Sequence, residues 1–218
     1  MKGELFLTQD GSSSLRHSLL GDSYHSEGGA VSESLHVYID AGFNSLDKNH
    51  ISIFEMGFGT GLNCALTLFQ AIRNSVSVDY HSVELYPIDQ EVVRELNYFK
   101  GDARQRELFE TLHRVGWNNQ QNIVPGFTLT KYHNSLENVE LNRQFDLIYF
   151  DAFAYDTQPE LWSVDIFRRI ASATVTRGVL VTYSSKGVVK QALRDAGFEV
   201  KRLAGACGKH HMLRAVKL

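Results

Sequence analysis

A glycine-rich turn constrains the fold of this chain more than any other segment. In the stretch FEMGFGTGLN, glycines stand at positions 57, 59 and 61, directly behind the short β-rich run 51–56. Apolar residues then recur at the spacings of an amphipathic helix over residues 62–72. A strand, a flexible turn and a helix make up the first half of a βαβ unit, so this segment predicts a parallel sheet of the α/β class.

The rest of the chain continues this alternation of apolar, strand-length runs with helix-period segments. Further strands are expected at 79–85, 127–133, 145–153, 178–184, 198–203 and 211–217, and further helices between 86 and 115, at 159–174 and at 186–196. The last two strands are separated by a loop too short for a crossover, so they should be antiparallel neighbours. We expect a Rossmann-like domain over residues 50–218, with a mostly parallel seven-stranded sheet and an antiparallel last strand.

The first 49 residues follow another pattern. Asp10 and Gly11 predict a hairpin, and the segment AVSESLHVYIDAGF predicts a helix that ends at Gly42. Because this segment precedes the glycine turn, we expect residues 1–49 to be a small extension that caps the sheet and adds no strand to it.

Composition narrows the class of protein. The length fits one globular domain, no uncharged apolar run approaches the roughly 20 residues of a membrane span, and the N-terminus lacks the apolar stretch of a secretory signal. We therefore expect a cytoplasmic protein. Cys64 and Cys207 lack metal-ligand spacing, and the pair His210 and His211 lacks a third ligand, so no metal site is predicted.

Charge is distributed unevenly along the chain. Residues 1–176 hold 13 Lys and Arg against 23 Asp and Glu, whereas residues 177–218 hold 9 against 2. A basic segment on an acidic body is typical of a surface that binds a polyanion such as RNA, although a solvated basic face without a partner gives the same pattern. Lys186 and Lys209 lie on segments that flank the predicted ligand crevice, where they are candidates for phosphate contacts.

The spacing of the glycines argues against a phosphate loop. The dinucleotide fingerprint GxGxxG needs a glycine where this chain has Leu62, and a P-loop needs a lysine that is absent. Glu55, two residues before the first glycine, would repel a diphosphate and attract an ammonium or sulfonium group. A cationic nucleoside such as S-adenosylmethionine therefore fits the turn, and a tight turn without any ligand is the alternative.

Two further strand ends supply candidate contacts for such a nucleoside. Glu84 closes the second strand, where an acid can accept hydrogen bonds from both ribose hydroxyls, although a lone acid there can also be a solvated strand end. Asn134 follows the third strand, where its amide can bind the edge of adenine or act as the N-cap of a helix.

Asp151 is the candidate for the chemical step. It emerges from the apolar run FDLIYF, and a carboxylate at the end of a buried strand costs free energy unless a partner or a reaction uses it. It can orient an amine and assist its deprotonation, and Phe153 can cover the methyl group or stack on a base. A structural carboxylate bonded to backbone amides, and a Phe153 that only packs in the core, remain the alternatives.

Several segments together resemble a known family. They are YHSEGGAVSESLHVYIDAG, IFEMGFGTGLN, VELYPI, FDLIYFDAFAYDTQPELW, GVLVTYSSKGVVKQALRDAGF and GKHHML, in this order over about residues 4–216. The chain looks like the methyltransferase domain of the bifunctional tRNA 5-methylaminomethyl-2-thiouridine biosynthesis protein and its stand-alone relatives. The glycine motif alone indicates only a generic methyltransferase, whereas the DAFAYDTQPELW and TYSSKG segments make the match specific.

This resemblance implies S-adenosylmethionine-dependent methylation of the aminomethyl nitrogen of a tRNA wobble uridine, with an anticodon stem-loop as partner. Carried over by motif, the residues of the cofactor turn are Glu55, Gly57, Gly59, Thr60, Gly61 and Asn63. Glu84 would bind the ribose, Asp151 and Phe153 would form the methyl-transfer site, and Glu33 matches a position near the pocket. His133 and Asn134 replace a Gly-Asp pair that is common in relatives, and the stretch at Lys209 replaces a more Arg-rich one.

Other functions remain open on the sequence. A small-molecule N- or O-methyltransferase would use the same turn without RNA, and a catalytically silent RNA-binding module could keep the fold. A nicotinamide oxidoreductase is disfavoured by Leu62 and Glu55. The bifunctional relatives carry a second, flavin-dependent domain, which we expect to be absent here because the chain ends at Leu218.

Overall fold

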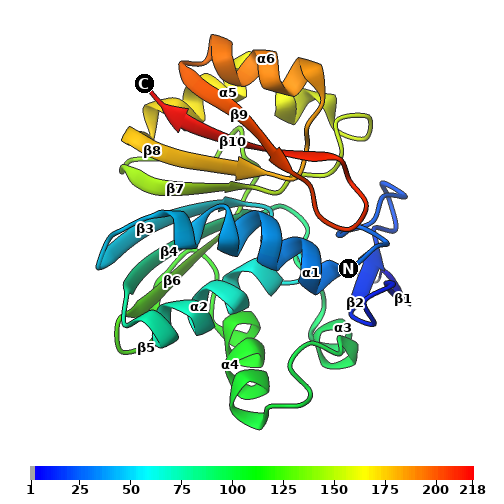
Figure 1. Cartoon of the computed structure of the whole chain (residues 1–218). Coiled ribbons are helices and arrows are strands. Elements are labelled where there is room, and N and C mark those ends of the chain that lie inside the picture. The colour runs from blue at the N-terminus through cyan, green and yellow to red at the C-terminus, as the bar shows by residue number, and fades with distance from the viewer. Residues whose placement is uncertain (1–2) are drawn as a thin grey trace.

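The glycine turn joins a central strand to a helix, as predicted. Figure 1 shows the computed structural model, which describes residues 3–218. The strand is β3 (His50–Met56) and the helix is α2 (Leu62–Asn74). Ile53 and Phe54 are both fully buried, on opposite faces of the sheet, so β3 lies in the middle of the fold with apolar layers on both sides.

The main sheet has eight strands in the order β5-β6-β4-β3-β7-β8-β10-β9. Their bounds are β4 (Ser77–Glu84), β5 (Gln120–Val124), β6 (Phe127–His133), β7 (Phe145–Phe150), β8 (Thr174–Thr182), β9 (Phe198–Ala204) and β10 (His211–Lys217). The strands β6, β4, β3, β7 and β8 are parallel, and β10 is antiparallel to both of its neighbours. The antiparallel pairing of the two last strands is confirmed.

The prediction of seven strands was wrong by one edge strand. β5 forms an antiparallel hairpin with β6 through a turn at Gly126, whose φ is +83°. Its sequence QQNIV holds only two apolar residues because the strand lies at an edge of the sheet and is only partly buried. Pairing with β6, and not a hydrophobic pattern, makes this segment a strand.

Helices cover both faces of the sheet (Figure 1). On one face lie α2 and α4 (Ala103–Arg114), together with the N-terminal helix, while α5 (Val164–Ser172) and α6 (Gly187–Asp195) pack on the other. The short elements are α3 (Gln90–Glu95), the 3-10 turns η2 (Phe43–Ser45) and η3 (Pro159–Trp162), and the N-terminal α1 (Ala30–Ser34) with the π-helix η1 (Leu35–Asp40). Within residues 3–218, no helix is long and apolar enough to cross a membrane.

The N-terminal segment forms a separate hairpin, as expected. β1 (Glu4–Leu7) and β2 (Ser13–Arg16) pair with each other in a two-stranded antiparallel sheet that adds no strand to the main one. The helix expected up to Gly42 is a single turn of α-helix, α1, that continues as the π-helix η1. Beyond the hairpin, the chain passes along the carboxyl ends of the parallel strands on its way to α1 (Figure 1).

Candidate active site

A cavity of about 600 Å³ lies at the carboxyl ends of the central parallel strands. Its walls come from the glycine turn after β3, the end of β4, the residues that follow β6 and β7, and residues 22–27 of the N-terminal segment. Open α/β sheets bind their ligands at this edge, because the turns between strands and helices leave a crevice there. The predicted site residues that line it are Glu33, Gly57, Gly59, Thr60, Asn63, Glu84, Asn134, Asp151, Phe153 and Lys209.

The glycine turn brings the end of β3 close to the end of β7. Gly57 has a φ of +89°, and a Cβ on it would lie 2.7 Å from the backbone oxygen of Asp151. Gly59 has a φ of +49° and lies against the ring of Tyr24. Gly61 is not among the cavity-lining residues: it is the N-cap that precedes α2, and a Cβ added to it would lie 2.7 Å from Nε2 of His113. Its lack of a side chain serves packing.

Glu84 ties the end of β4 to this turn. One carboxylate oxygen accepts a hydrogen bond from the amide of Gly59 (2.9 Å), and the other accepts one from the amide of Tyr86 (2.7 Å). Burial raises the pKa of Glu84. Each carboxylate oxygen has a second lone pair, so Glu84 can still accept the two hydroxyls of a ribose that enters the cavity.

The placement of Glu55 corrects the sequence interpretation. We expected its carboxylate at the mouth of the turn, but Glu55 has 0 % exposure and does not line the cavity. Side chains alternate along a strand, so Glu55 shares the face of Ile53 and points into the layer under α2. There it accepts a hydrogen bond from Ser82 (2.7 Å), and burial raises its pKa to about 8. At neutral pH Glu55 is therefore mostly uncharged and does not attract a cation.

Asp151 lines the cavity and lies between two hydrogen-bond donors. Its Oδ1 accepts a hydrogen bond from the hydroxyl of Tyr38 (2.6 Å), and its Oδ2 accepts one from the amide of Asn63 (2.8 Å). Burial raises the pKa of Asp151 to about 7, against the lowering effect of these two hydrogen bonds. A carboxyl that changes its charge near neutral pH can accept and release a proton during a reaction.

The loop after Asp151 is held rigidly. Tyr183, just beyond β8, donates its hydroxyl proton to the oxygen of Ala152 (2.8 Å), and the indole of Trp162 donates to the oxygen of Phe153 (2.9 Å). These bonds leave the ring of Phe153 edge-on to Tyr24, with centroids 5.1 Å apart. Phe153 therefore belongs to an aromatic wall of the cavity.

The N-terminal segment contributes more to the site than the sequence indicated. Tyr24 stands over Gly59, and its hydroxyl is buried without a partner among the described residues. Asp22 fastens the segment, because it accepts hydrogen bonds from the amide of Ala154 (3.2 Å) and the hydroxyl of Thr157 (2.8 Å). Only Glu33 had been assigned to the pocket from this region, although YHSE stood among the family-like segments and offered a signal.

The two candidate lysines lie in different places. Lys209, in the loop between β9 and β10, lines the cavity and pairs with Glu33. Lys186 does not line it: its ammonium group pairs with Asp156 (2.5 Å) and lies over the ring of Tyr155. The predicted contact of Lys186 with a ligand in the crevice is therefore not supported by its position.

Asn134 lines the cavity where an adenine contact was expected. Its Oδ1 accepts a hydrogen bond from the amide of Ser135 (2.9 Å), and a turn follows. The alternative role as a helix N-cap was wrong, because no helix begins at this point of the described chain. Its Nδ2 can donate to an acceptor nitrogen of a bound base.

This chain is similar in sequence and in structure to known methyltransferases. A profile of S-adenosyl-L-methionine-dependent methyltransferases matches residues 120–218. The crystal structure of MNMC2 from Aquifex aeolicus is 26% identical and superposes with a TM-score of 0.81, covering 100% of this chain and 70% of that one. The chain is an S-adenosylmethionine-dependent methyltransferase.

Curated relatives of this methyltransferase are longer proteins. The tRNA 5-methylaminomethyl-2-thiouridine biosynthesis bifunctional protein MnmC of Burkholderia multivorans is 33% identical over 215 residues, and its namesake from Nitrosospira multiformis is 33% identical over 211. These matches cover 88% and 89% of this chain but 32% and 34% of the relatives. The methyltransferase thus spans about a third of the length of the curated relatives that it matches.

The residues of the cavity suit S-adenosylmethionine. Glu84 offers acceptors for a ribose, Asn134 a donor for a base, and the backbone of Gly57 and Gly59 permits close approach of the chain to a ligand. The aromatic wall and Asp151 lie on the side of the cavity that is formed by the loop after β7.

Proposed function

We propose that this methyltransferase transfers a methyl group to the nitrogen of a 5-aminomethyl group on a (2-thio)uridine at the wobble position of tRNA, giving 5-methylaminomethyl-(2-thio)uridine. The observation that carries the proposal is Asp151: a carboxyl in the cavity wall, held by Tyr38 and Asn63, with a pKa of about 7. Such a group suits an amine acceptor, because an amine must lose a proton in the reaction and most oxygen or carbon nucleophiles need a stronger base.

Asp151 can take the proton that the substrate amine must lose. An alkylamine is mostly protonated at neutral pH, and only its neutral form has the lone pair that attacks. Asp151 accepts a hydrogen bond from the nitrogen, orients it and takes its proton, while Tyr38 and Asn63 keep the carboxylate in place. S-adenosylmethionine supplies the methyl group when bound: a carbon–nitrogen bond forms, the carbon–sulfur bond breaks, and the proton leaves through Asp151.

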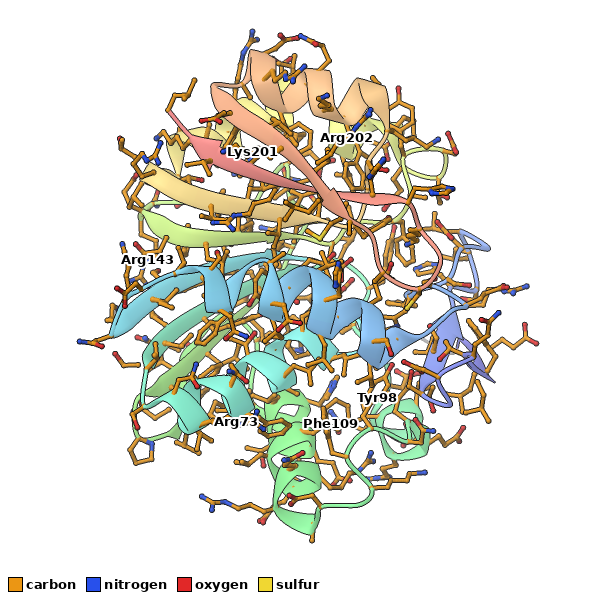
Figure 2. The ribbon with its side chains drawn as sticks, in the orientation of Figure 1. Arg73, Tyr98, Phe109, Arg143, Lys201 and Arg202 are labelled. Atoms are coloured by element: carbon orange, nitrogen blue, oxygen red, sulfur yellow. The ribbon has the colours of Figure 1, made fainter. Side chains whose placement is uncertain are left out.

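A cluster of basic residues on α6 and β9 supports an RNA substrate. Lys190 and Arg194 on α6 lie close enough to Arg202 on β9 for the two arginines to lower the pKa of Lys190. Figure 2 labels Lys201 and Arg202 on this strand, at the end of the molecule away from α4. Phosphate contacts of this kind position a nucleic acid without reading its sequence. The relatives from Burkholderia multivorans and Nitrosospira multiformis are named as tRNA biosynthesis proteins, which agrees with this surface.

Mass spectrometry of tRNA nucleosides tests the proposal. Aminomethyl-containing tRNA is incubated with the protein and S-adenosylmethionine and then digested. We expect the aminomethyl nucleoside to disappear and a product heavier by about 14 mass units, one CH2, to replace it. An unchanged nucleoside profile would refute the proposal. Methylation of small amines that is insensitive to salt and to added tRNA would instead favour the small-molecule methyltransferase.

A further inference from the structure

A second carboxylate of the cavity is occupied by a side chain of the protein itself. Oε1 of Glu33 pairs with the ammonium group of Lys209, and Oε2 accepts a hydrogen bond from the amide of Ser26 (3.0 Å). The same ammonium group lies over the ring of Tyr183, 4.5 Å from its centroid. The three residues come from α1, from the segment just after β8 and from the loop between β9 and β10, and all of them line the cavity.

This arrangement is a binding site for a primary ammonium group. A carboxylate accepts its hydrogen bonds, and an aromatic face attracts its positive charge. Glu33 is held by the amide of Ser26, and Tyr183 by its hydrogen bond to Ala152, so the site persists when Lys209 leaves. It also lies beside the proposed proton acceptor, because the charges of Glu33 and Lys209 both shift the pKa of Asp151.

Lys209 is suited to leave. Its side chain is 36% exposed, whereas that of Glu33 is 8% exposed, so the lysine reaches the site from solvent. The loop that carries it has positive φ values at Cys207 and Gly208, and it lies in the basic C-terminal part of the chain. A phosphate of a bound RNA therefore competes with Glu33 for the same ammonium group.

We propose that Glu33 and Tyr183 form the subsite that holds the ammonium group of the substrate, and that Lys209 fills this subsite until an RNA phosphate draws it away. The proposal rests on the proposed function, since it takes the substrate to be a primary amine on RNA. A tethered lysine acts as a competitor at a high effective concentration, so it keeps free amines out of the cavity. Only an amine that is part of an RNA arrives together with the phosphate that draws Lys209 out of the subsite.

Nucleoside binding tests the subsite without RNA. Lys209→Met removes the charge and keeps an unbranched side chain. Lys48→Met is the matched control, because Lys48 pairs with Asp146 near the amino end of β7, whereas the cavity lies at the carboxyl ends of the strands. The dissociation constant of 5-aminomethyluridine is measured by calorimetry with S-adenosylhomocysteine present. We expect about tenfold tighter binding to Lys209→Met, which corresponds to about 1.4 kcal/mol. The affinity of Lys48→Met should be unchanged. Neutral 5-hydroxymethyluridine should bind the wild type and both variants equally.

A second variant and an RNA substrate complete the test. Glu33→Gln should weaken the binding of 5-aminomethyluridine and leave that of 5-hydroxymethyluridine unchanged. With an aminomethylated anticodon stem-loop, Lys209→Met should raise KM several-fold, the opposite sign to its effect on the nucleoside. Equal or weaker binding of 5-aminomethyluridine to Lys209→Met would overturn the proposal. A wild type that binds the nucleosides as expected but does not methylate RNA would refute the proposed function while leaving the ammonium subsite supported.

Discussion

At the scale of single residues, the surroundings of a carboxyl group decide what it does. Asp151 and Glu55 both have raised pKa values because of burial, yet Asp151 opens onto the cavity and Glu55 does not. Asn63 connects them, since it donates to Asp151 and also lowers the pKa of Glu55. One of the two acids can therefore exchange a proton with a ligand, and the other is part of the support under the glycine turn.

The pH dependence of methyl transfer follows from Asp151. Its carboxylate form must be present, so kcat should rise with pH through about 7 and fall below it. Tyr38→Phe removes a hydrogen bond that lowers this pKa, so the midpoint of the profile should move to higher pH.

Asp151→Asn should reduce kcat by about 100-fold or more, with a cofactor dissociation constant within several-fold of the wild type. Near-normal turnover of Asp151→Asn would remove its catalytic role.

Glu55 should make the protein less stable at high pH. Its pKa is raised from 4.5 to about 8 in the folded state, so the folded protein binds more protons than the unfolded chain in this window. The free energy of unfolding should therefore fall as pH rises through this window, with a contribution from Glu55 of up to about 1.4 kcal/mol per pH unit. Urea unfolding of Glu55→Gln at several pH values should show a flatter dependence. A slope equal to that of the wild type would mean that Glu55 is ionised in the fold.

The sequence predicted the residues at strand ends well and their neighbours poorly. Glu84 and Asp151 lie where a parallel sheet must place them, because Glu84 ends a strand and Asp151 directly follows one. Glu55 was misplaced although strand alternation from Ile53 could have shown its direction. Tyr38 was not predicted as a partner of Asp151, since 113 residues separate the two and only the tertiary fold brings them together.

At the scale of elements, the turn after β3 and the end of β7 depend on each other. The backbone of Gly57 approaches that of Asp151 so closely that no side chain fits between them. The β3–α2 unit could be predicted because its pattern is local, and the edge strand β5 could not, because its pairing decides its structure. The segment over the cavity escaped prediction for the same reason: its position depends on the bonds of Asp22 to the loop after β7.

Gly57→Ala should damage both structure and cofactor binding. A residue with a Cβ at a φ of +89° costs roughly 1–2 kcal/mol, and the added carbon would lie 2.7 Å from the oxygen of Asp151. We expect a lower melting temperature and at least about tenfold weaker binding of S-adenosylmethionine by calorimetry. Gly187→Ala is the control, because a Cβ there meets no atom within 4 Å, and it should leave both quantities nearly unchanged. If Gly57→Ala bound S-adenosylmethionine with wild-type affinity, the turn could accommodate a side chain without loss of cofactor binding, and the prediction would be wrong.

At the scale of the whole molecule, the basic residues of the C-terminal part gather at one end of the fold. The basic residues 177–218 build β10, β9 and α6, which form one end of the sheet, while α4 and β5 form the other (Figure 1). Lys209, which lines the cavity, belongs to the same basic part of the chain as Arg194 and Arg202. The uneven charge of the sequence thus becomes a direction of approach in the folded protein.

RNA affinity should depend on this basic end. Arg194→Gln combined with Arg202→Gln should weaken binding of the anticodon stem-loop and lower the slope of log Kd against log salt by about two. The same double change should leave the affinity for S-adenosylmethionine unaltered. Arg104→Gln, on α4 at the other end of the molecule, is the control and should bind RNA as the wild type does. An unchanged salt slope in the double variant would place the RNA on another face.

In the π-helix η1, the number of residues matters as much as their identity. A π-helix holds one residue more per hydrogen-bonded turn than an α-helix, and such segments often occur at functional sites. Tyr38 lies within Leu35–Asp40, so its reach to Asp151 depends on this wider winding. Deleting one residue here would rewind the segment as an α-helix and rotate the hydroxyl away without altering Tyr38 itself. When relatives of this enzyme are compared, a one-residue gap between Ser34 and Gly42 is therefore as informative as a substitution.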